Sequence, residues 1–132
     1  MKESIATFIL THEKLATTLR RTVEKIIGHQ EHLFAFSNEE ADLNELADLI
    51  INQQAEIGAT RIICFVDLVG GSCWRLGHMI KHKLPHTHVI GGVNIPMLLA
   101  YFTADPMLSL EERIEKAVAD GIRGIVYAKG VF

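Results

Sequence analysis

The stretch RIICFVDLVGGS, residues 61–72, joins an apolar run to a loop with two consecutive glycines. After its first residue, Arg61–Val66 is continuously apolar, which is typical of a central parallel strand covered on both faces. The segment Asp67–Ser72 predicts a loop from this strand into a helix, which Ser72 can cap. A strand of this kind needs helices on both sides of its sheet, so the stretch indicates an α/β fold.

The segments on either side of this stretch repeat the same alternation of short apolar runs and longer helical patterns. The expected order is strand, helix, strand, with a pair of helices before the last strand, which predicts parallel pairing and right-handed crossovers. The fold class is therefore a doubly wound, mostly parallel sheet, for which 2-1-3-4 is a common strand order. Besides residues 61–66, we expect strands at Ile5–Leu10, His32–Phe36, His88–Ile90 and Gly124–Ala128.

Several residues mark where the helices begin and end. Asp42 with Glu45, and Ser109 with Glu112, have the spacing of an N-cap and its partner in the first turn. Pro96 suits a first helical turn, and glycines commonly end helices. We expect helices at 15–27 ending at Gly28, 42–57, 72 to about 83, 96 to about 102, and 109–120 ending at Gly121.

Length and charge limit the possible functions. The chain has 132 residues, which is typical of a single domain spanning 1–132. Its 13 lysines and arginines against 16 aspartates and glutamates give a net charge of −3, which argues against nucleic acid as the main partner. No apolar run approaches the roughly 20 residues of a membrane span, and the amino-terminal segment has the pattern of a strand. We therefore expect a cytoplasmic protein without membrane insertion, with Cys64 and Cys73 as reduced thiols.

Two loops are the expected location of the chemistry. Ligands of open parallel sheets bind beyond the carboxyl ends of the strands, where the strand order reverses. With the order 2-1-3-4, this point lies between the first and third strands, which are followed by Thr11–Glu13 and Asp67–Ser72. An Asp67 carboxylate that accepts one ring N–H of His12 would leave the other nitrogen free as a nucleophile or base.

The glycine pair adds an anion site to this nucleophile. Backbone N–H groups near Gly70, Gly71 and Ser72, at the positive end of a helix, favour a bound anion. A nucleophilic imidazole beside such a site suggests a histidine that accepts a phosphoryl group. The alternative is a strand-end histidine and a capping aspartate without a chemical role.

Four segments resemble one protein family. They are FILTHEKLA (8–16), IIGHQE (26–31), FVDLVGGS (65–72) and GGVNIPMLL (91–99). In order and spacing, they resemble the enzyme IIA components of the mannose-type sugar phosphotransferase system of bacteria. The resemblance covers nearly the whole chain.

The resemblance implies a phosphoryl carrier that needs no metal or other cofactor. His12 would accept a phosphoryl group from the carrier protein HPr and pass it to an enzyme IIB domain, while Asp67 orients the ring. Thr11, Gly71 and Ser72 would donate hydrogen bonds to the phosphoryl oxygens. The family fold has the sheet order 2-1-3-4, with a last strand, here Gly124–Ala128, exchanged across a homodimer.

The sequence departs from the family pattern at two places. Glu13 replaces the usual glycine after the histidine, and its carboxylate would repel a phosphoryl group, face solvent or engage a basic partner. Cys73, Trp74 and Arg75 replace the usual Pro-Phe-Asn after Ser72. These changes leave open a stand-alone regulatory phosphoacceptor. A nucleotide- or ligand-binding α/β domain is a further class, although the chain lacks both common phosphate-loop motifs.

Other residues carry open alternatives. Arg75 is either a phosphate contact or part of a changed partner surface, and Trp74 either docks HPr or packs against the fourth strand. Asn94 supports the aspartate or a phosphate oxygen, or it is simply an N-cap. His78 and His82 share a helix face, but the pattern around them favours a solvated helix end over a metal site.

Overall fold

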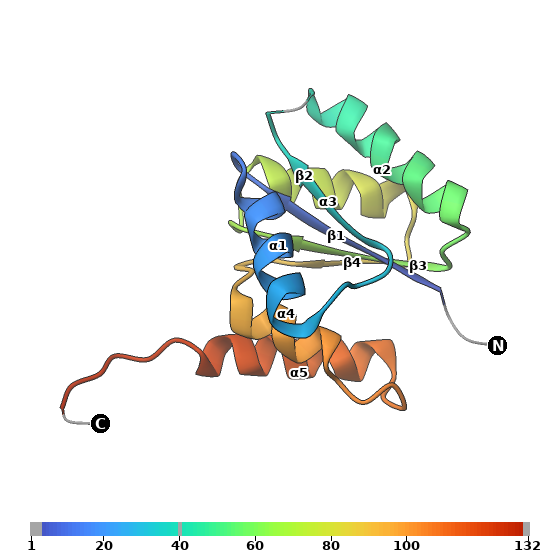
Figure 1. Ribbon diagram of the computed structural model, residues 1–132. Coiled ribbons are helices and arrows are strands. Elements are labelled where there is room, and N and C mark those ends of the chain that lie inside the picture. Colours follow the sequence, from blue (N-terminus) through green and yellow to red (C-terminus); the bar gives the residue numbers. More distant parts are fainter. Residues whose placement is uncertain (1–3, 40, 131–132) are drawn as a thin grey trace. The chain divides into compact units, whose positions relative to one another are not determined.

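Figure 1 shows a computed structural model, which describes residues 4–39 and 41–130 of the chain. The chain divides into two compact units, Met1–Val93 and Asn94–Phe132. The first unit contains the whole sheet. In the described residues, no helix has both the length and the apolar character that crossing a bilayer requires.

The sheet has the expected topology. Its four strands run in the order β2-β1-β3-β4, and every neighbouring pair is parallel. The doubly wound α/β fold with strand order 2-1-3-4 is therefore confirmed. The strands are β1 (Ile5–Thr11), β2 (Leu33–Ser37), β3 (Arg61–Val66) and β4 (Thr87–Ile90).

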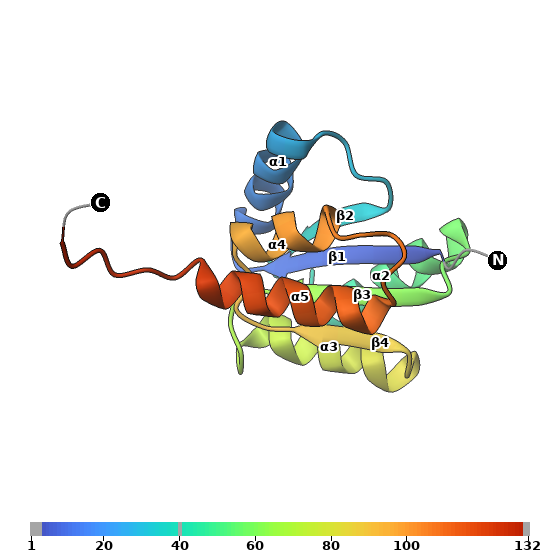
Figure 2. The same ribbon diagram turned by 90° about the horizontal axis from the view of Figure 1, so that it is seen from below.

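Helices cover both faces of this sheet. Helices α2 (Leu43–Ile57) and α3 (Ser72–Lys83) pack on one face, and α1 (Leu15–Ile27) lies on the other (Figures 1 and 2). Every residue of the central strands β1 and β3 after the first is buried, as expected for parallel strands covered on both faces. The core between the sheet, α2 and α3 includes Phe8, Cys64, Leu46, Leu76 and Ile80.

The second unit is a pair of helices, α4 (Ile95–Phe102) and α5 (Leu110–Arg123), in contact with each other. The Ser109 hydroxyl accepts a hydrogen bond from the Glu112 amide, and the Glu112 side chain accepts one from the Ser109 amide. The predicted capping box is therefore confirmed. The Asp42 carboxylate likewise accepts a hydrogen bond from the Glu45 amide at the start of α2.

The prediction that Gly121 ends the last helix is wrong. Helix α5 continues through Gly121 to Arg123, and Gly124 is its C-cap. A Cβ at position 121 would lie 3.0 Å from the Met97 Cβ of α4. The glycine therefore permits close packing of two helices rather than ending one.

The predicted strand Gly124–Ala128, which the resemblance assigns to exchange with a second copy of the chain, is not paired within the single chain. Residues 125–129 form no strand, and Ile125, Val126 and Tyr127 are 75–81% exposed. Their alternation of β-branched and aromatic side chains resembles a strand. However, a strand also needs a hydrogen-bonding neighbour, and the described part of the chain provides none here.

Candidate functional site

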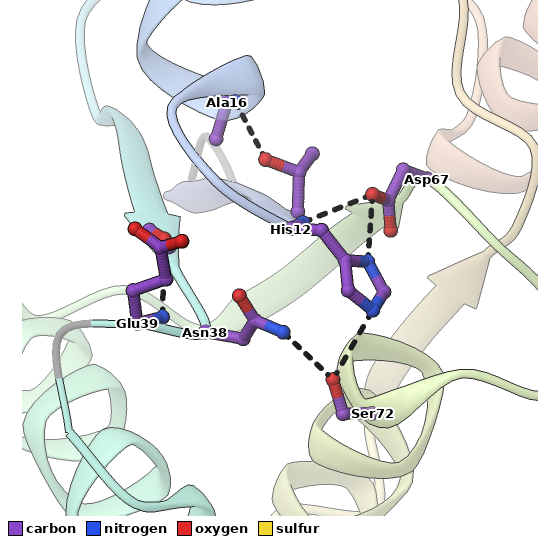
Figure 3. A network of polar contacts seen from close by, with 8 residues as sticks. His12, Ala16, Asn38, Glu39, Asp67 and Ser72 are labelled. Carbon is purple, nitrogen blue, oxygen red and sulfur yellow. Dashed lines mark hydrogen bonds and ion pairs between the residues drawn. The ribbon is translucent and has the colours of Figure 1, made fainter.

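The strand order brings the two predicted catalytic residues together. Strands β1 and β3 are neighbours, with Leu10 paired to Val66, so the residues that follow them lie at the same edge. The Nδ1 atom of His12 lies 3.0 Å from Oδ2 of Asp67 (Figure 3). The same carboxylate oxygen accepts a hydrogen bond of 2.9 Å from the His12 backbone amide.

This geometry determines what the imidazole can do. An ionised carboxylate only accepts hydrogen bonds, so the 3.0 Å contact assigns the ring proton to Nδ1. Nε2 then keeps its lone pair. The His12 side chain is 41% exposed, whereas that of Asp67 is 15% exposed. The arrangement is that of an oriented nucleophile open to a partner.

Ser72 faces the free ring nitrogen. Its hydroxyl oxygen lies 3.5 Å from Nε2 of His12, at the first residue of α3. Gly71, the N-cap of α3, packs closely against the His12 ring, because a Cβ at this position would lie only 3.2 Å from Cε1 of His12. Its own amide donates to the Leu68 carbonyl in a turn. The Ser72 hydroxyl is therefore the side-chain donor placed where an anion on Nε2 would lie.

Thr11 makes a hydrogen bond that the sequence analysis did not predict. Its side chain is fully buried, and its hydroxyl accepts a hydrogen bond of 2.6 Å from the Ala16 amide at the start of α1. This bond closes the loop that carries His12 (Figure 3). The contact supports a part for Thr11 in fixing the loop rather than in binding a phosphoryl oxygen with its side chain.

Asn38 is a site residue that the sequence analysis missed. It follows β2, and its side-chain amide donates a hydrogen bond of 3.1 Å to the Ser72 hydroxyl oxygen (Figure 3). The Ser72 oxygen is then an acceptor toward Asn38, so its own proton can point at the site. The strand order could have indicated Asn38, because in the order 2-1-3-4 the loop after β2 lies at the same sheet edge as the loop after β1.

Glu13 lies at the rim of the site. Its φ of 56° places it in the left-handed region, which explains why a glycine suits this position. Its carboxyl group faces Glu39, whose pKa is raised first by the hydrogen bond with Glu13 and then by the charge of Glu13. The two acidic side chains thus share one exposed corner beside His12.

Helix α3, which begins at Ser72, also carries two of the residues that depart from the family pattern, Trp74 and Arg75. Trp74 is half-buried and packs near Gly91, where a Cβ would lie 3.1 Å from its ring, and its ring centroid lies 4.7 Å from that of His78. The packing alternative for Trp74, beyond the end of β4, is therefore the one observed. Arg75 lines a surface groove along α3 with His78 and His82. No hydrogen bond joins Arg75 to His12 or Ser72 among the described contacts.

Asn94 caps a helix in the second unit. Its side-chain oxygen accepts a hydrogen bond from the Met97 amide, and its side-chain nitrogen donates to the Gly121 carbonyl. The N-cap alternative is therefore confirmed. Both ends of the side-chain amide are engaged within the helix pair, so these bonds give no support to a role in phosphate binding.

A family model and several relatives match this chain. The model EIIA-man, described as PTS system fructose IIA component, matches residues 6–118. The chain is 34% identical over 125 residues to the mannose-specific EIIAB components of Escherichia coli strain K12 and Shigella flexneri. The alignment covers 92% of this chain but 39% of those relatives, so the chain spans well under half of their length.

Solved structures match the fold. EIIA from Streptococcus agalactiae aligns with a TM-score of 0.82 at 20% identity, over 93% of this chain and 96% of that one. The mannose/sorbose-specific IIA subunit from Enterococcus faecalis aligns with a TM-score of 0.81 at 17% identity, over 100% and 98% of the two chains. At these identities the likeness concerns the fold. The family match and the 34% identity go further, and they show that the chain belongs to the mannose-type enzyme IIA family of the phosphotransferase system.

Proposed function

We propose that this chain is a phosphoryl carrier whose acceptor is His12. The donor is the phosphohistidine of HPr, and the next acceptor is an enzyme IIB domain. The observation that supports this function most directly is the 3.0 Å contact between Nδ1 of His12 and Asp67, which leaves Nε2 free. Family membership supports the same reaction class.

The transfer exchanges one nitrogen–phosphorus bond for another. The Nε2 lone pair of His12 attacks the phosphorus in line, and the donor's nitrogen–phosphorus bond breaks with its electron pair returning to the donor ring. Asp67 keeps the Nδ1 proton in place and stabilises the positive charge that the ring acquires. The Ser72 hydroxyl and the amino-terminal end of α3 face the phosphoryl oxygens.

The second transfer is the same step in reverse, with an enzyme IIB side chain as the nucleophile. Positioning and charge stabilisation perform most of the catalysis, since no proton has to leave the site. The reaction therefore requires no nucleotide or other cofactor.

Incubation with enzyme I, HPr and phosphoenolpyruvate tests this function. We expect one acid-labile, base-stable phosphate per chain, and its discharge when an enzyme IIB domain is added. No labelling would overturn the proposal. Labelling without discharge would instead support the regulatory alternative, which Glu13 and the acidic corner beside His12 favour.

Replacing Asn38 with alanine should slow phosphorylation of His12 by about 5–10-fold, the value of one hydrogen bond in the transition state. The physical reason is that Ser72 loses the donor that orients its hydroxyl. The rate of label uptake from phospho-HPr measures the effect. In a Ser72→Ala background the same change should have almost no effect, and additive losses would contradict this coupling.

Changes at Glu13 separate charge from backbone strain. Glu13→Gln should speed phosphorylation about 2–5-fold, because it removes a negative charge beside the site. Glu13→Gly should produce the same gain in rate and also raise the stability by roughly 0.5–1 kcal/mol, since glycine adopts a φ of 56° without strain. Transfer rates and urea unfolding measure the two effects. An equal gain in stability in both variants would contradict the strain argument.

We also propose that Gly124–Ala128 pairs with a second copy of the chain as an exchanged strand. The exposed Ile125, Val126 and Tyr127 fit a buried strand better than a solvated tail. Val126→Pro removes an amide donor, and it should shift the dimer toward monomer by at least about 10-fold in dissociation constant. Light scattering after gel filtration measures this. The exposed Met107→Lys serves as the matched control, and a monomeric parent chain would overturn the proposal.

A further inference from the structure

Cys73 lies beside the His12–Asp67 pair, a position that the phosphoryl transfer does not use. One ligand atom from each of these three side chains lies within 4.8 Å of the other two. They come from three separate places, namely the loop after β1, the loop after β3 and the first turn of α3. No other group of three such side chains gathers in the described ranges, 4–39 and 41–130.

Asp67 has an unused ligand atom. Its Oδ2 accepts two hydrogen bonds from His12, whereas its Oδ1 is buried and has no hydrogen-bond partner among the described residues. A buried carboxylate oxygen without a donor is costly. A cation against Oδ1 would remove this cost, so the carboxylate has both the charge and the free oxygen of a metal ligand.

The spacing of the three side chains is close to that of a tetrahedral metal centre. Ligands held about 2.0–2.3 Å from zinc lie roughly 3.3–3.7 Å from one another. One ligand atom of each of the three side chains lies at most 4.8 Å from the other two. Closing the widest gap takes about 1 Å, which side-chain rotation supplies. The 41% exposed imidazole gives an ion access from solvent.

We propose that His12, Asp67 and Cys73 form a binding site for a thiophilic divalent cation of the zinc class. Sulfur, imidazole and carboxylate together suit Zn²⁺, whereas Mg²⁺ and Ca²⁺ take oxygen ligands. The fourth position is open toward the exposed side of His12 and takes water. The Cys73 thiol gives up its proton to solvent as the sulfur–metal bond forms.

Metal binding at this site should release protons. A thiol binds a metal as the thiolate, so the Cys73 proton leaves as the sulfur–metal bond forms. Each bound ion should release about one proton, which can be measured in weakly buffered solution.

A bound metal would oppose the proposed function, on which this consequence rests. If the cation binds Nε2, it uses the nucleophilic lone pair, and if it binds Nδ1, the ring proton must move to Nε2, so Nε2 has no free lone pair in either case. Phosphorylation and metal binding would then exclude each other. The binding measurements below do not involve HPr, so either proposal can fail without the other.

Cobalt(II) titration of the full chain tests the site directly. We expect one Co²⁺ per chain, with a thiolate-to-metal charge-transfer band and the visible spectrum of tetrahedral cobalt, displaced by Zn²⁺. Cys73→Ser should abolish the charge-transfer band and weaken Co²⁺ binding by about 100-fold or more. The matched control is Cys64→Ser, because Cys64 is equally buried but lies in β3 away from the pair. A charge-transfer band that survives Cys73→Ser would overturn the proposal.

A second measurement needs no variant. Diethylpyrocarbonate acylates accessible imidazoles, and peptide mass spectrometry locates the product. Equimolar Zn²⁺ should slow the acylation of His12 at least about 10-fold and leave the exposed His29 unchanged. Equal protection of both histidines, or of neither, would overturn the proposal. The pair His78→Gln with His82→Gln should retain full Co²⁺ binding, which excludes the groove on α3 as the site.

Discussion

Replacing His12 with alanine is expected to remove all acid-labile phosphate from the chain. Nε2 of this imidazole is the nucleophile in the proposed transfer, and the described contacts show no other ring oriented by a carboxylate at the same strand edge. Loss of a covalent nucleophile typically costs about 10⁶-fold in rate, which places the variant below detection. The measurement is label uptake from phospho-HPr, followed by mass spectrometry of the intact chain.

A matched control for this variant is available in the same unit. The exposed His29 lies at the end of α1 and contacts Glu24 rather than the site. His29→Ala should be phosphorylated at the parent rate, with an unchanged melting temperature. If His12→Ala still took up one acid-labile phosphate, the acceptor would be another histidine and the proposed mechanism would be wrong.

The Asp67→Asn variant is expected to slow phosphorylation by at least about 100-fold while the fold stays intact. An amide can still accept the hydrogen bond from the His12 backbone, so the loop keeps its geometry. It carries no charge to stabilise the ring as the new bond forms, and it can present its NH₂ group to Nδ1. In a hydrolase triad, the corresponding change costs about 10⁴-fold through the wrong tautomer.

Single-turnover transfer rates and thermal unfolding should be measured together for this variant. Asp48→Asn is the control. The exposed Asp48 side chain pairs with Lys83 and has no contact with His12 among the described interactions. We expect the control to transfer at the parent rate. A parent-like rate in Asp67→Asn would remove the orienting role, and a large fall in its melting temperature would mean that the loss of rate reports on folding.

The central part of the fold was predictable because its signals are local. The run Arg61–Val66, apolar after its first residue, is typical of a covered strand, and the caps at Asp42 and Ser109 follow from hydrogen bonds within a single turn. Once the strand order was assumed, the meeting of His12 and Asp67 followed from the pairing of β1 with β3.

The error at Gly121 arises because one residue type serves two purposes. A glycine such as Gly121 marks the end of a helix in one context and close helix packing in another, and only the neighbouring Met97 decides. The pattern of residues 125–129 fits a strand, but pairing depends on a partner that a single chain does not specify.

Side-chain contacts at the site were harder to predict than backbone positions. The sequence does not reveal that the Thr11 hydroxyl accepts a hydrogen bond from the Ala16 amide. Cys73 follows Asp67 by six residues, and its approach to the pair depends on the exact phase of α3. Asn38 comes from a third loop, which requires the strand order to be known first.

The two hydrogen bonds from His12 to a single oxygen of Asp67 affect how partner proteins must behave. Because both the main chain and the ring of His12 bond to that one atom, the imidazole is held in a single orientation. Under the proposed function, donor and recipient must present their reactive groups at the same fixed spot. HPr and the enzyme IIB domain must therefore bind one after the other, and the turnover rate depends on how quickly HPr dissociates.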